Sequence, residues 1–247
     1  MSEKRIDDVC DVIDIIVELF IQFLVTIIYM SIDVVIVLLL VLILIAKFYD
    51  IGSYDTININ GDQFNVLNEY PTSRADAAKI LSIVYDRIVK FLEYERVKYR
   101  VGLTKEEVTK LGPGTDPVIA GHSAKKIIEA ILYSFDPESV YENDPNNMSG
   151  STSYTVQKGQ SMYVCLRNKD GSFVDINTLM FVVLHELSHI GAYWTFGHTN
   201  DFWSTFAFIL QDAIEADVYK YVDYAKNPVD YCGLIIKTSP YVPIDSL

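Results

Sequence analysis

The most restrictive feature of this chain is one long apolar stretch near its amino terminus. Residues 11 to 49 read "DVIDIIVELFIQFLVTIIYMSIDVVIVLLLVLILIAKFY", and few charged residues interrupt the run. A helix of this composition is apolar on all sides rather than along one stripe. Since a membrane crossing takes about 20 helical residues, the run is longer than one crossing needs. It predicts an N-terminal membrane anchor over residues 1 to 50.

Two layouts of this anchor fit the sequence. A single span would end near Tyr49, and a hairpin would turn near Ser31 to Asp33. The single span is favoured, because Asp14 and Glu18 would be costly in the middle of a bilayer. A cleaved signal peptide is disfavoured, because the run is much longer than a signal peptide's apolar region. We therefore expect localisation at a membrane, with the orientation left open because basic residues flank both ends.

Composition narrows the classes of partner. The chain has 247 residues, of which 33 are acidic and 20 are Lys or Arg, so its net charge is -13. Such a chain repels a phosphate backbone, and no nucleic-acid partner is expected. Its three cysteines, Cys10, Cys165 and Cys232, are too few and too scattered for a disulfide framework or a CxxC zinc site. We expect the fold to hold without disulfides; the oligomeric state stays open.

Residues 51 to 247 predict an α+β domain. Asn60-Gly61 between alternating residues indicates a β-hairpin, Ser73 can cap a long helix, and Thr104 to Glu107 reads as a capping box. "SYTVQKGQSMYVCLR" is typical of two strands joined by a turn. The triplet at Asn147 matches a glycosylation sequon, which we interpret as a chance match.

The segment "INTLMFVVLHELSHIG" contains candidate metal-binding and catalytic residues. It is apolar on nearly all sides, so it predicts a buried helix, for which Asp175 is the N-cap. His185 and His189 are four residues apart, so their imidazoles lie one turn apart on the same face and can bind one zinc ion. Glu186 lies beside them, where its carboxylate can reach a water molecule as general base. His122 is interpreted as a surface or capping histidine.

A catalytic zinc normally takes three protein ligands, so a third is needed. Gly191 can end the helix, and the loop "AYWTFG" can bring His198 back to the metal. Thr199 would cap the next helix, whose apolar stripe would hold His198 in position. Glu215 is the competing third ligand, by analogy with other His2Glu sites. A closed structural zinc would need a fourth ligand, and we interpret Cys165, the nearby thiol, as a core residue instead.

Burial argues for a metal at this place. Placing His185, Glu186 and His189 on a buried helix would cost several kcal/mol without partners, and a metal compensates for that cost. The predicted ligand set is therefore His185, His189 and His198, with Zn2+ as the cofactor.

The stretch "HELSHIGAYWTFGHTNDFW" resembles the zincin metallopeptidases of the WLM and SprT groups, in which HExxH is followed by a GHxxxFW-like segment. From "NVLNEYP" to "YVDYAKNPVDYCGLIIKTSP", the chain is similar to WLM-like zinc metallopeptidases of large DNA viruses, many of which carry an N-terminal hydrophobic anchor. This resemblance implies His185, His189 and His198 as zinc ligands and Glu186 as the catalytic acid and base. It also implies an edge strand, residues 161 to 167, which can bind an extended peptide.

The sequence thus predicts a membrane-anchored, zincin-like α+β protein that hydrolyses peptide bonds with zinc-activated water and Glu186. Its partner would be a protein or peptide substrate. Two alternatives remain open: a protease for proteins crosslinked to DNA, as in cellular WLM and SprT relatives, and a non-catalytic membrane or virion protein that zinc stabilises. Tyr193 lies in the active-site loop, but as one of 17 tyrosines it is interpreted as a bystander.

Overall fold

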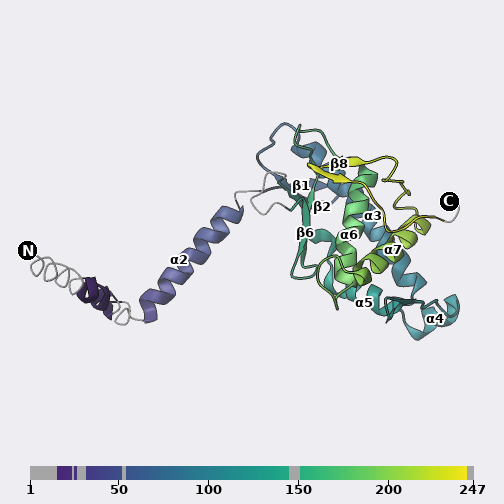
Figure 1. The fold of residues 1–247 in the computed structure, drawn as a ribbon, viewed down its shortest axis with the longest axis horizontal. Coiled ribbons are helices and arrows are strands. Elements are labelled where there is room, and N and C mark those ends of the chain that lie inside the picture. The colour runs from purple at the N-terminus through teal and green to yellow at the C-terminus, as the bar shows by residue number, and fades with distance from the viewer. Residues whose placement is uncertain (1–15, 24, 27–31, 52–53, 145–150, 244–247) are drawn as a thin grey trace, which may run out of the picture. The chain divides into compact units, whose positions relative to one another are not determined.

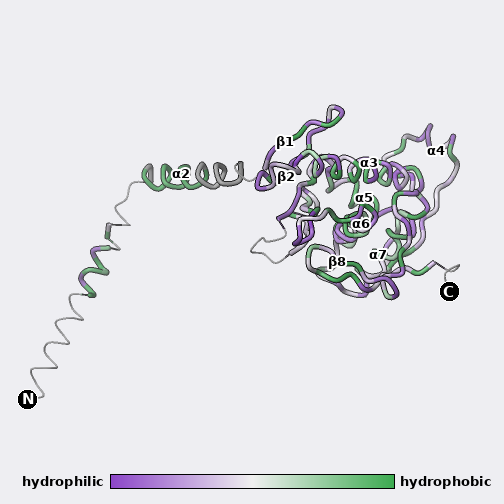
Figure 2. The backbone as a smooth tube through the Cα atoms, turned by 90° about the horizontal axis from the view of Figure 1, so that it is seen from above, coloured by the Kyte–Doolittle hydropathy of each residue, from purple (hydrophilic) through white to green (hydrophobic). Residues whose placement is uncertain are grey.

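The computed structural model describes residues 16–23, 25–26, 32–51, 54–144 and 151–243. The chain separates into two compact units, Met1–Ser53 and Tyr54–Leu247 (Figure 1). In the first unit, helix α2 spans Ile32–Ile51, and Figure 2 shows part of it in green, the colour of hydrophobic residues. Cys10, Ser31 and the sequon at Asn147 lie outside the described residues.

The described residues do not contain the predicted membrane-spanning segment. Among the described residues, no helix combines the length and the apolar character needed to span a membrane. The prediction of a transmembrane helix or hairpin is therefore wrong. It counted apolar residues along the whole run, whereas a crossing needs about 20 of them in one continuous helix. In α2, Asp33 and Lys47 confine the uninterrupted apolar part to residues 34 to 46.

The second unit is built on a five-stranded mixed sheet with the strand order β1-β2-β5-β7-β6. The predicted hairpin is confirmed, because the two strands that flank Asn60 and Gly61 pair antiparallel and both turn residues have positive φ. The β2–β5 and β5–β7 pairs are parallel, and the β6–β7 pair is antiparallel. The strands are β1 (Tyr54–Ile59), β2 (Asp62–Leu67), β5 (Val140–Asn143), β6 (Ser153–Val156) and β7 (Ser161–Cys165).

The edge of this sheet differs from the prediction. Strand β7, expected at the edge, lies between β5 and β6, and β6 occupies the end of the sheet. Met162 and Val164 of β7 are fully buried, whereas β6 has no fully buried residue among its four. Strands β6 and β7 look alike in sequence, so the sequence does not show which of them lies at the edge. Pairing with β5, which is distant in the chain, makes β7 an internal strand of the sheet. The candidate edge for peptide binding is therefore β6.

Helices complete the α+β architecture, as predicted. Helix α6 packs against α3, α5, α7 and the strands β6 and β7, so it lies at the centre of the unit (Figure 1). The capping box from Thr104 to Glu107 is present. The helices are α3 (Arg74–Lys98), α4 (Lys105–Leu111), α5 (Ala124–Ser134), α6 (Ile176–Gly191) and α7 (Asn200–Glu215), with a 3-10 turn at Pro137–Ser139. Two small hairpins pair β3 (Val118–Ile119) with β4 (His122–Ser123) and β8 (Val229–Tyr231) with β9 (Leu234–Ile236).

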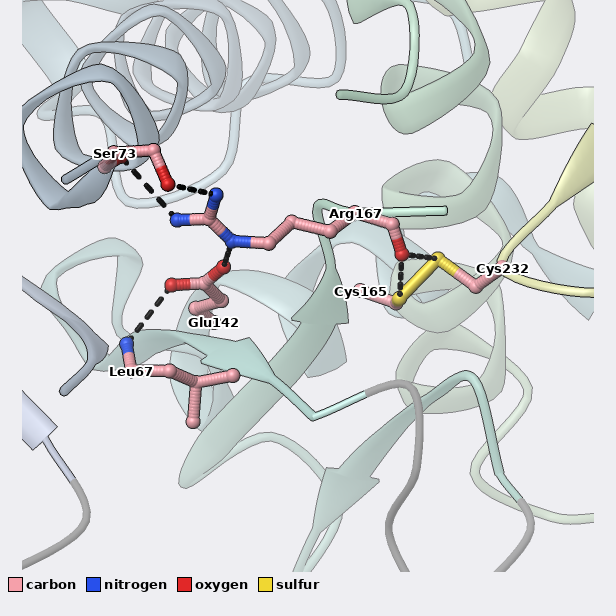
Figure 3. Close-up of polar contacts among 6 residues, drawn as sticks. All are labelled: Leu67, Ser73, Glu142, Cys165, Arg167 and Cys232. Carbon is pink, nitrogen blue, oxygen red and sulfur yellow. Dashed lines mark hydrogen bonds and ion pairs between the residues drawn. A yellow bond between two sulfur atoms is a disulfide. The ribbon is translucent and has the colours of Figure 1, made fainter. Parts of the chain in front are cut away.

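A buried arginine ties several of these elements together (Figure 3). Arg167, 2% exposed, donates from Nε to Oε1 of Glu142 on β5 at 2.6 Å. It also donates from Nη1 to Oγ of Ser73 at 2.6 Å. The other oxygen of Glu142 accepts the backbone N–H of Leu67 at 2.8 Å. Ser73 occupies the N-cap position of α3, but its hydroxyl serves Arg167 and makes no capping hydrogen bond, which corrects the predicted role.

A disulfide joins Cys165 at the end of β7 to Cys232 in the β8–β9 turn. The carbonyl oxygen of Arg167 contacts both sulfur atoms, at 3.1 and 3.0 Å (Figure 3). The expectation of a fold without disulfides is therefore wrong. The two cysteines are 67 residues apart, so no local spacing pattern pairs them. The bond attaches the β8–β9 hairpin to the central sheet.

A buried carboxyl group makes stability depend on pH. Glu95 of α3 is 1% exposed, and its carboxyl oxygens have no hydrogen-bond partner among the described residues. Burial, and then the negative charge of Asp212 on α7, raise the pKa of Glu95 to about 10. The folded chain thus holds a proton that the unfolded chain releases above about pH 4.3. Stability is lost as pH rises through this window, up to about pH 10.

Glu95→Gln is therefore expected to stabilise the protein at alkaline pH. Relative to the wild type, its free energy of unfolding should rise by more than about 1 kcal/mol between about pH 5 and about pH 9, since one pKa unit corresponds to about 1.4 kcal/mol. Urea denaturation at several pH values measures this difference. Glu106→Gln, at an exposed position on α4, is the matched control. A difference that does not change with pH would contradict the protonated state of Glu95.

Candidate metal centre

The central helix α6 presents the histidines of the HELSH segment. It forms where predicted: the Asp175 side chain accepts the backbone N–H groups of Asn177 and Thr178, which caps the helix. Leu179, Val183 and Leu187 are fully buried in the core. His185 and His189 lie on the face that remains partly open to solvent. The apolar faces of α6 thus direct these two imidazoles to the molecular surface.

The structure brings three histidines together. The ligand nitrogen atoms of His185, His189 and His198 all lie within 4.8 Å of one another. Nε2 of His198 lies 3.0 Å from Nε2 of His185, and the ring centroid of His189 lies 4.9 Å from that of His185 and 5.0 Å from that of His198. The loop after α6 therefore reaches back to the face of α6, as the sequence predicts.

Aromatic side chains of α7 hold this cluster in position. The Phe202 ring stacks on His189 with a centroid distance of 4.1 Å, and the Trp203 ring stacks on His198 at 5.4 Å. Phe206 meets His185 edge to face at 5.1 Å. Thr199 caps α7 by accepting the backbone N–H of Phe202. His198 directly precedes the N-cap of α7, so this helix fixes the position of His198.

The loop between α6 and α7 is tied down by polar and aromatic contacts. Nε1 of Trp194 donates to Oδ2 of Asp201 at 3.0 Å. Nζ of Lys158 donates to the carbonyl oxygen of Tyr193 at 2.7 Å. His122 stacks on Trp194 with a centroid distance of 3.6 Å, so the fourth histidine supports the loop and lies outside the histidine cluster. These contacts hold the loop in the position that places His198 beside His185 and His189.

Glu215 is not part of the cluster. Its carboxylate accepts hydrogen bonds from Lys98 at 2.6 Å and from Tyr94 at 2.8 Å. It ends α7, whereas His198 precedes the start of that helix. A helix of this length spans more than about 20 Å, because each residue adds about 1.5 Å. The structure therefore favours His198 over Glu215 as the third candidate ligand.

Burial sets the charge state of the cluster. It lowers the pKa of His185 to about 3 and that of His189 to about 4, with additional repulsion from the neighbouring histidines. Both rings are therefore neutral at pH 7, the form in which imidazole binds metals. Burial also raises the pKa of Glu186, which is 6% exposed, to about 7. A carboxyl group with this pKa can exchange a proton near neutral pH, as a general acid or base must.

The cluster lies in a cleft of about 840 Å³. One wall consists of residues 151 to 155, which include the free end of the sheet at β6, and another of residues 231 to 238, which include the β8–β9 hairpin. Phe181, Val182 and Trp203 add apolar surface, and Glu186 also lines the cleft. The site is thus a cleft lined by the two helices α6 and α7, by strand β6 and by the β8–β9 hairpin.

The sequence did not identify the β8–β9 hairpin as part of the site. Tyr231 is 1% exposed, and its hydroxyl lies 2.5 Å from Oγ of Ser153 on β6. It also accepts the backbone N–H of Cys165 at 3.1 Å. Together with the disulfide, these bonds hold the hairpin across the cleft from α6. The Cys232-Gly233 turn is a local hairpin signal, but its position at the cleft depends on contacts with distant residues.

Comparison with known proteins finds relatives in two viruses. It is 34% identical to "Uncharacterized protein R325" of Acanthamoeba polyphaga mimivirus over 165 residues, which cover 66% of this chain and 73% of that protein. The chain belongs to the family of this mimivirus protein. It is also 27% identical to "Uncharacterized protein 136R" of Invertebrate iridescent virus 6 over 130 residues, which cover 51% of this chain and 68% of that protein.

The other comparisons add no relative to this family. No protein-family model matches the chain, and no solved structure matches it. The names of the mimivirus and iridescent virus proteins state no activity. An assignment of function therefore rests on the site.

Proposed function

We propose that this protein is a zinc-dependent endopeptidase, with His185, His189 and His198 as the metal ligands and Glu186 as the general base. The observation that carries the proposal is the convergence of three imidazoles next to a buried carboxyl group in one open cleft. Three histidines with a fourth position free for water are the donor set of catalytic zinc sites.

The donor atoms lie close enough together for one such ion, since all three ligand nitrogens are within 4.8 Å of one another. In tetrahedral zinc sites with Zn–N bonds of about 2.0–2.1 Å, ligand nitrogens lie about 3.3 Å apart. The 3.0 Å between the Nε2 atoms of His185 and His198 is close to that value. Both α6 histidines are neutral at pH 7, so they need not release a proton to bind a metal. We infer that the cluster is a metal site rather than a group of core histidines.

In this proposal, zinc, Glu186 and the walls of the cleft each have a separate role in the reaction. Zinc, when bound, supplies a Lewis acid that polarises a carbonyl group and lowers the pKa of water. Glu186 would accept the proton of the attacking water and then donate it to the leaving amine, the acid-and-base role of the glutamate in an HExxH arrangement. The walls formed by β6 and the β8–β9 hairpin hold the peptide, and a free strand edge can pair with an extended chain.

Metal binding is tested on the purified full chain. We expect one zinc per chain by elemental analysis. His198→Ala should weaken zinc binding by more than about 100-fold, beyond the 10- to 100-fold effects typical of residues that only support a ligand. Glu215→Gln is the matched control and should keep full affinity. If Glu215→Gln loses zinc while His198→Ala retains it, the ligand assignment is wrong.

Cleavage is tested on an unfolded protein substrate with the zinc-loaded chain, with and without a chelator. Cleavage that the chelator stops and zinc restores is the expected result. Zinc binding without cleavage of any substrate would instead favour a metal that only stabilises the fold. Stimulation of cleavage by DNA would favour a protease for crosslinked proteins, although the net charge of -13 disfavours DNA binding.

A further inference from the structure

We propose that the cleft selects peptide segments that carry aspartate or glutamate side chains, and that Lys169 and Lys237 bind them. This inference rests on the proposed peptidase function and names the substrate class of the same site. Both lysines line the cleft that contains the three histidines.

The charge of the cleft is opposite to that of the chain. The protein has 33 acidic residues against 20 lysines and arginines, yet among the described residues that line the cleft Glu186 is the only acidic one. Lys169 and Lys237 are the basic residues of that lining. Asp230, whose Oδ1 accepts the backbone N–H of Gly233 at 3.1 Å, is outside this lining. The lining itself therefore carries two ammonium groups and one carboxyl group, and direct contact with the ammonium groups attracts anionic ligands even on an acidic protein.

Lys169 is held at the cleft by its neighbours. The adjacent residue, Asn168, accepts the backbone N–H of Cys232 at 3.2 Å through Oδ1, and its own N–H donates to the carbonyl oxygen of Ser172 at 2.8 Å. The Lys169 side chain then lies over Gly233, where a Cβ atom would be 2.7 Å from Cε and 3.0 Å from Nζ. The glycine in the hairpin turn therefore leaves room for the ammonium group beside the cleft.

Lys237 is placed by the other end of the hairpin. It follows Ile236, the last residue of β9, which is 9% exposed and packs in the core. Both lysines are themselves exposed. Within the described part of the chain, no carboxylate oxygen lies within 4.0 Å of either ammonium group. Both charges therefore remain available for a ligand.

The remaining lining favours a peptide as the carrier of the negative charge. Leu234 and Ile235 of β9 are more than half exposed and line the same wall. Apolar side chains of this kind bind the side chains of a peptide, which a free inorganic anion lacks. The opposite wall contains β6, at the end of the sheet. An extended peptide with acidic side chains can contact both walls of the cleft and pair with the two lysines at the same time.

The test compares two fluorescent peptides that differ only by glutamate or glutamine at positions flanking one cleavable bond. Cleavage is measured with the zinc-loaded full chain, and binding of the same peptides by anisotropy with the zinc-free chain. We expect the wild type to favour the glutamate peptide about three- to tenfold in both measurements, and the preference to shrink as salt is raised. In Lys169→Gln/Lys237→Gln the ratio should fall to about one.

Lys105→Gln, at an exposed position at the start of α4, is the matched control and should keep the preference. Equal binding of both peptides by the wild type, or an unchanged ratio in the double variant, would overturn the inference. Absence of cleavage would contradict the proposed peptidase function, whereas the binding ratio would still decide whether the cleft selects acidic peptides. The two failures are therefore distinguishable.

Discussion

Glu186→Gln is expected to eliminate peptide-bond cleavage while leaving zinc bound. The substitution removes the proposed general base but keeps the size and shape of the side chain. General acid–base groups contribute about 100- to 10,000-fold to enzymatic rates, so cleavage should fall by at least about 100-fold. Glu186 is absent from the histidine cluster that forms the candidate metal site. Zinc per chain, measured by elemental analysis, should therefore stay at the wild-type value.

The same variant separates a catalytic carboxyl group from a structural one. Glu186 is 6% exposed, and burial alone raises its pKa. A neutral glutamine should not lower the melting temperature, because it avoids the cost of burying a charge. Glu129→Gln, at an exposed position on α5, is the control and should cleave like the wild type. Full activity of Glu186→Gln would exclude Glu186 as the base.

Arg167→Met is expected to lower the free energy of unfolding by about 3–5 kcal/mol, the usual cost of removing one partner from a buried ion pair. The Glu142 side chain is fully buried, and without Arg167 its charge has no counterion. Burial already raises the pKa of Glu142 despite the bonds from Leu67 and Arg167. Arg167 also lies between the rings of Tyr70 and Phe173, at 4.6 and 4.5 Å from their centroids.

Denaturation in urea measures this loss. Arg167→Met/Glu142→Gln should recover part of the stability, because the second change removes the unpaired charge, and a double-mutant cycle gives the coupling energy. Arg96→Met breaks the exposed pair with Glu93 on α3 and is the control, with an expected cost below about 1 kcal/mol. A loss in Arg167→Met no larger than in this control would show that the buried pair does not stabilise the fold.

Several local features could be read from the sequence because short-range geometry governs them. Spacing by four residues on a helix places His185 and His189 on one face, whatever the rest of the fold. The Asn60-Gly61 turn and the caps at Thr104, Asp175 and Thr199 depend on backbone groups only a few residues away. Residues close in the chain are close in space at little entropic cost, which is why these patterns succeed. The cap predicted at Ser73 is wrong because the distant Arg167 takes up the hydroxyl group of Ser73.

Three further predictions were wrong because they concern non-local or global properties. The apolar run over residues 11 to 49 does not yield a described helix that can span a membrane. Strand β7 is internal because it pairs with β5, which local sequence does not reveal. Cys165 meets Cys232 across 67 residues of chain. Each of these outcomes depends on contacts between distant segments or on where a helix begins and ends. Neither can be read from amino-acid composition.

In the candidate site, too, some features could be predicted from the sequence and others could not. The amino-acid sequence was enough to propose the two ligands and the carboxyl group on α6, because they follow from helix periodicity and burial. Folding of the whole domain was needed to bring His198 to them, to exclude Glu215, and to set Lys169 and Lys237 along the cleft. Those positions result from packing and bonds between segments far apart in the chain, which local sequence patterns do not reveal.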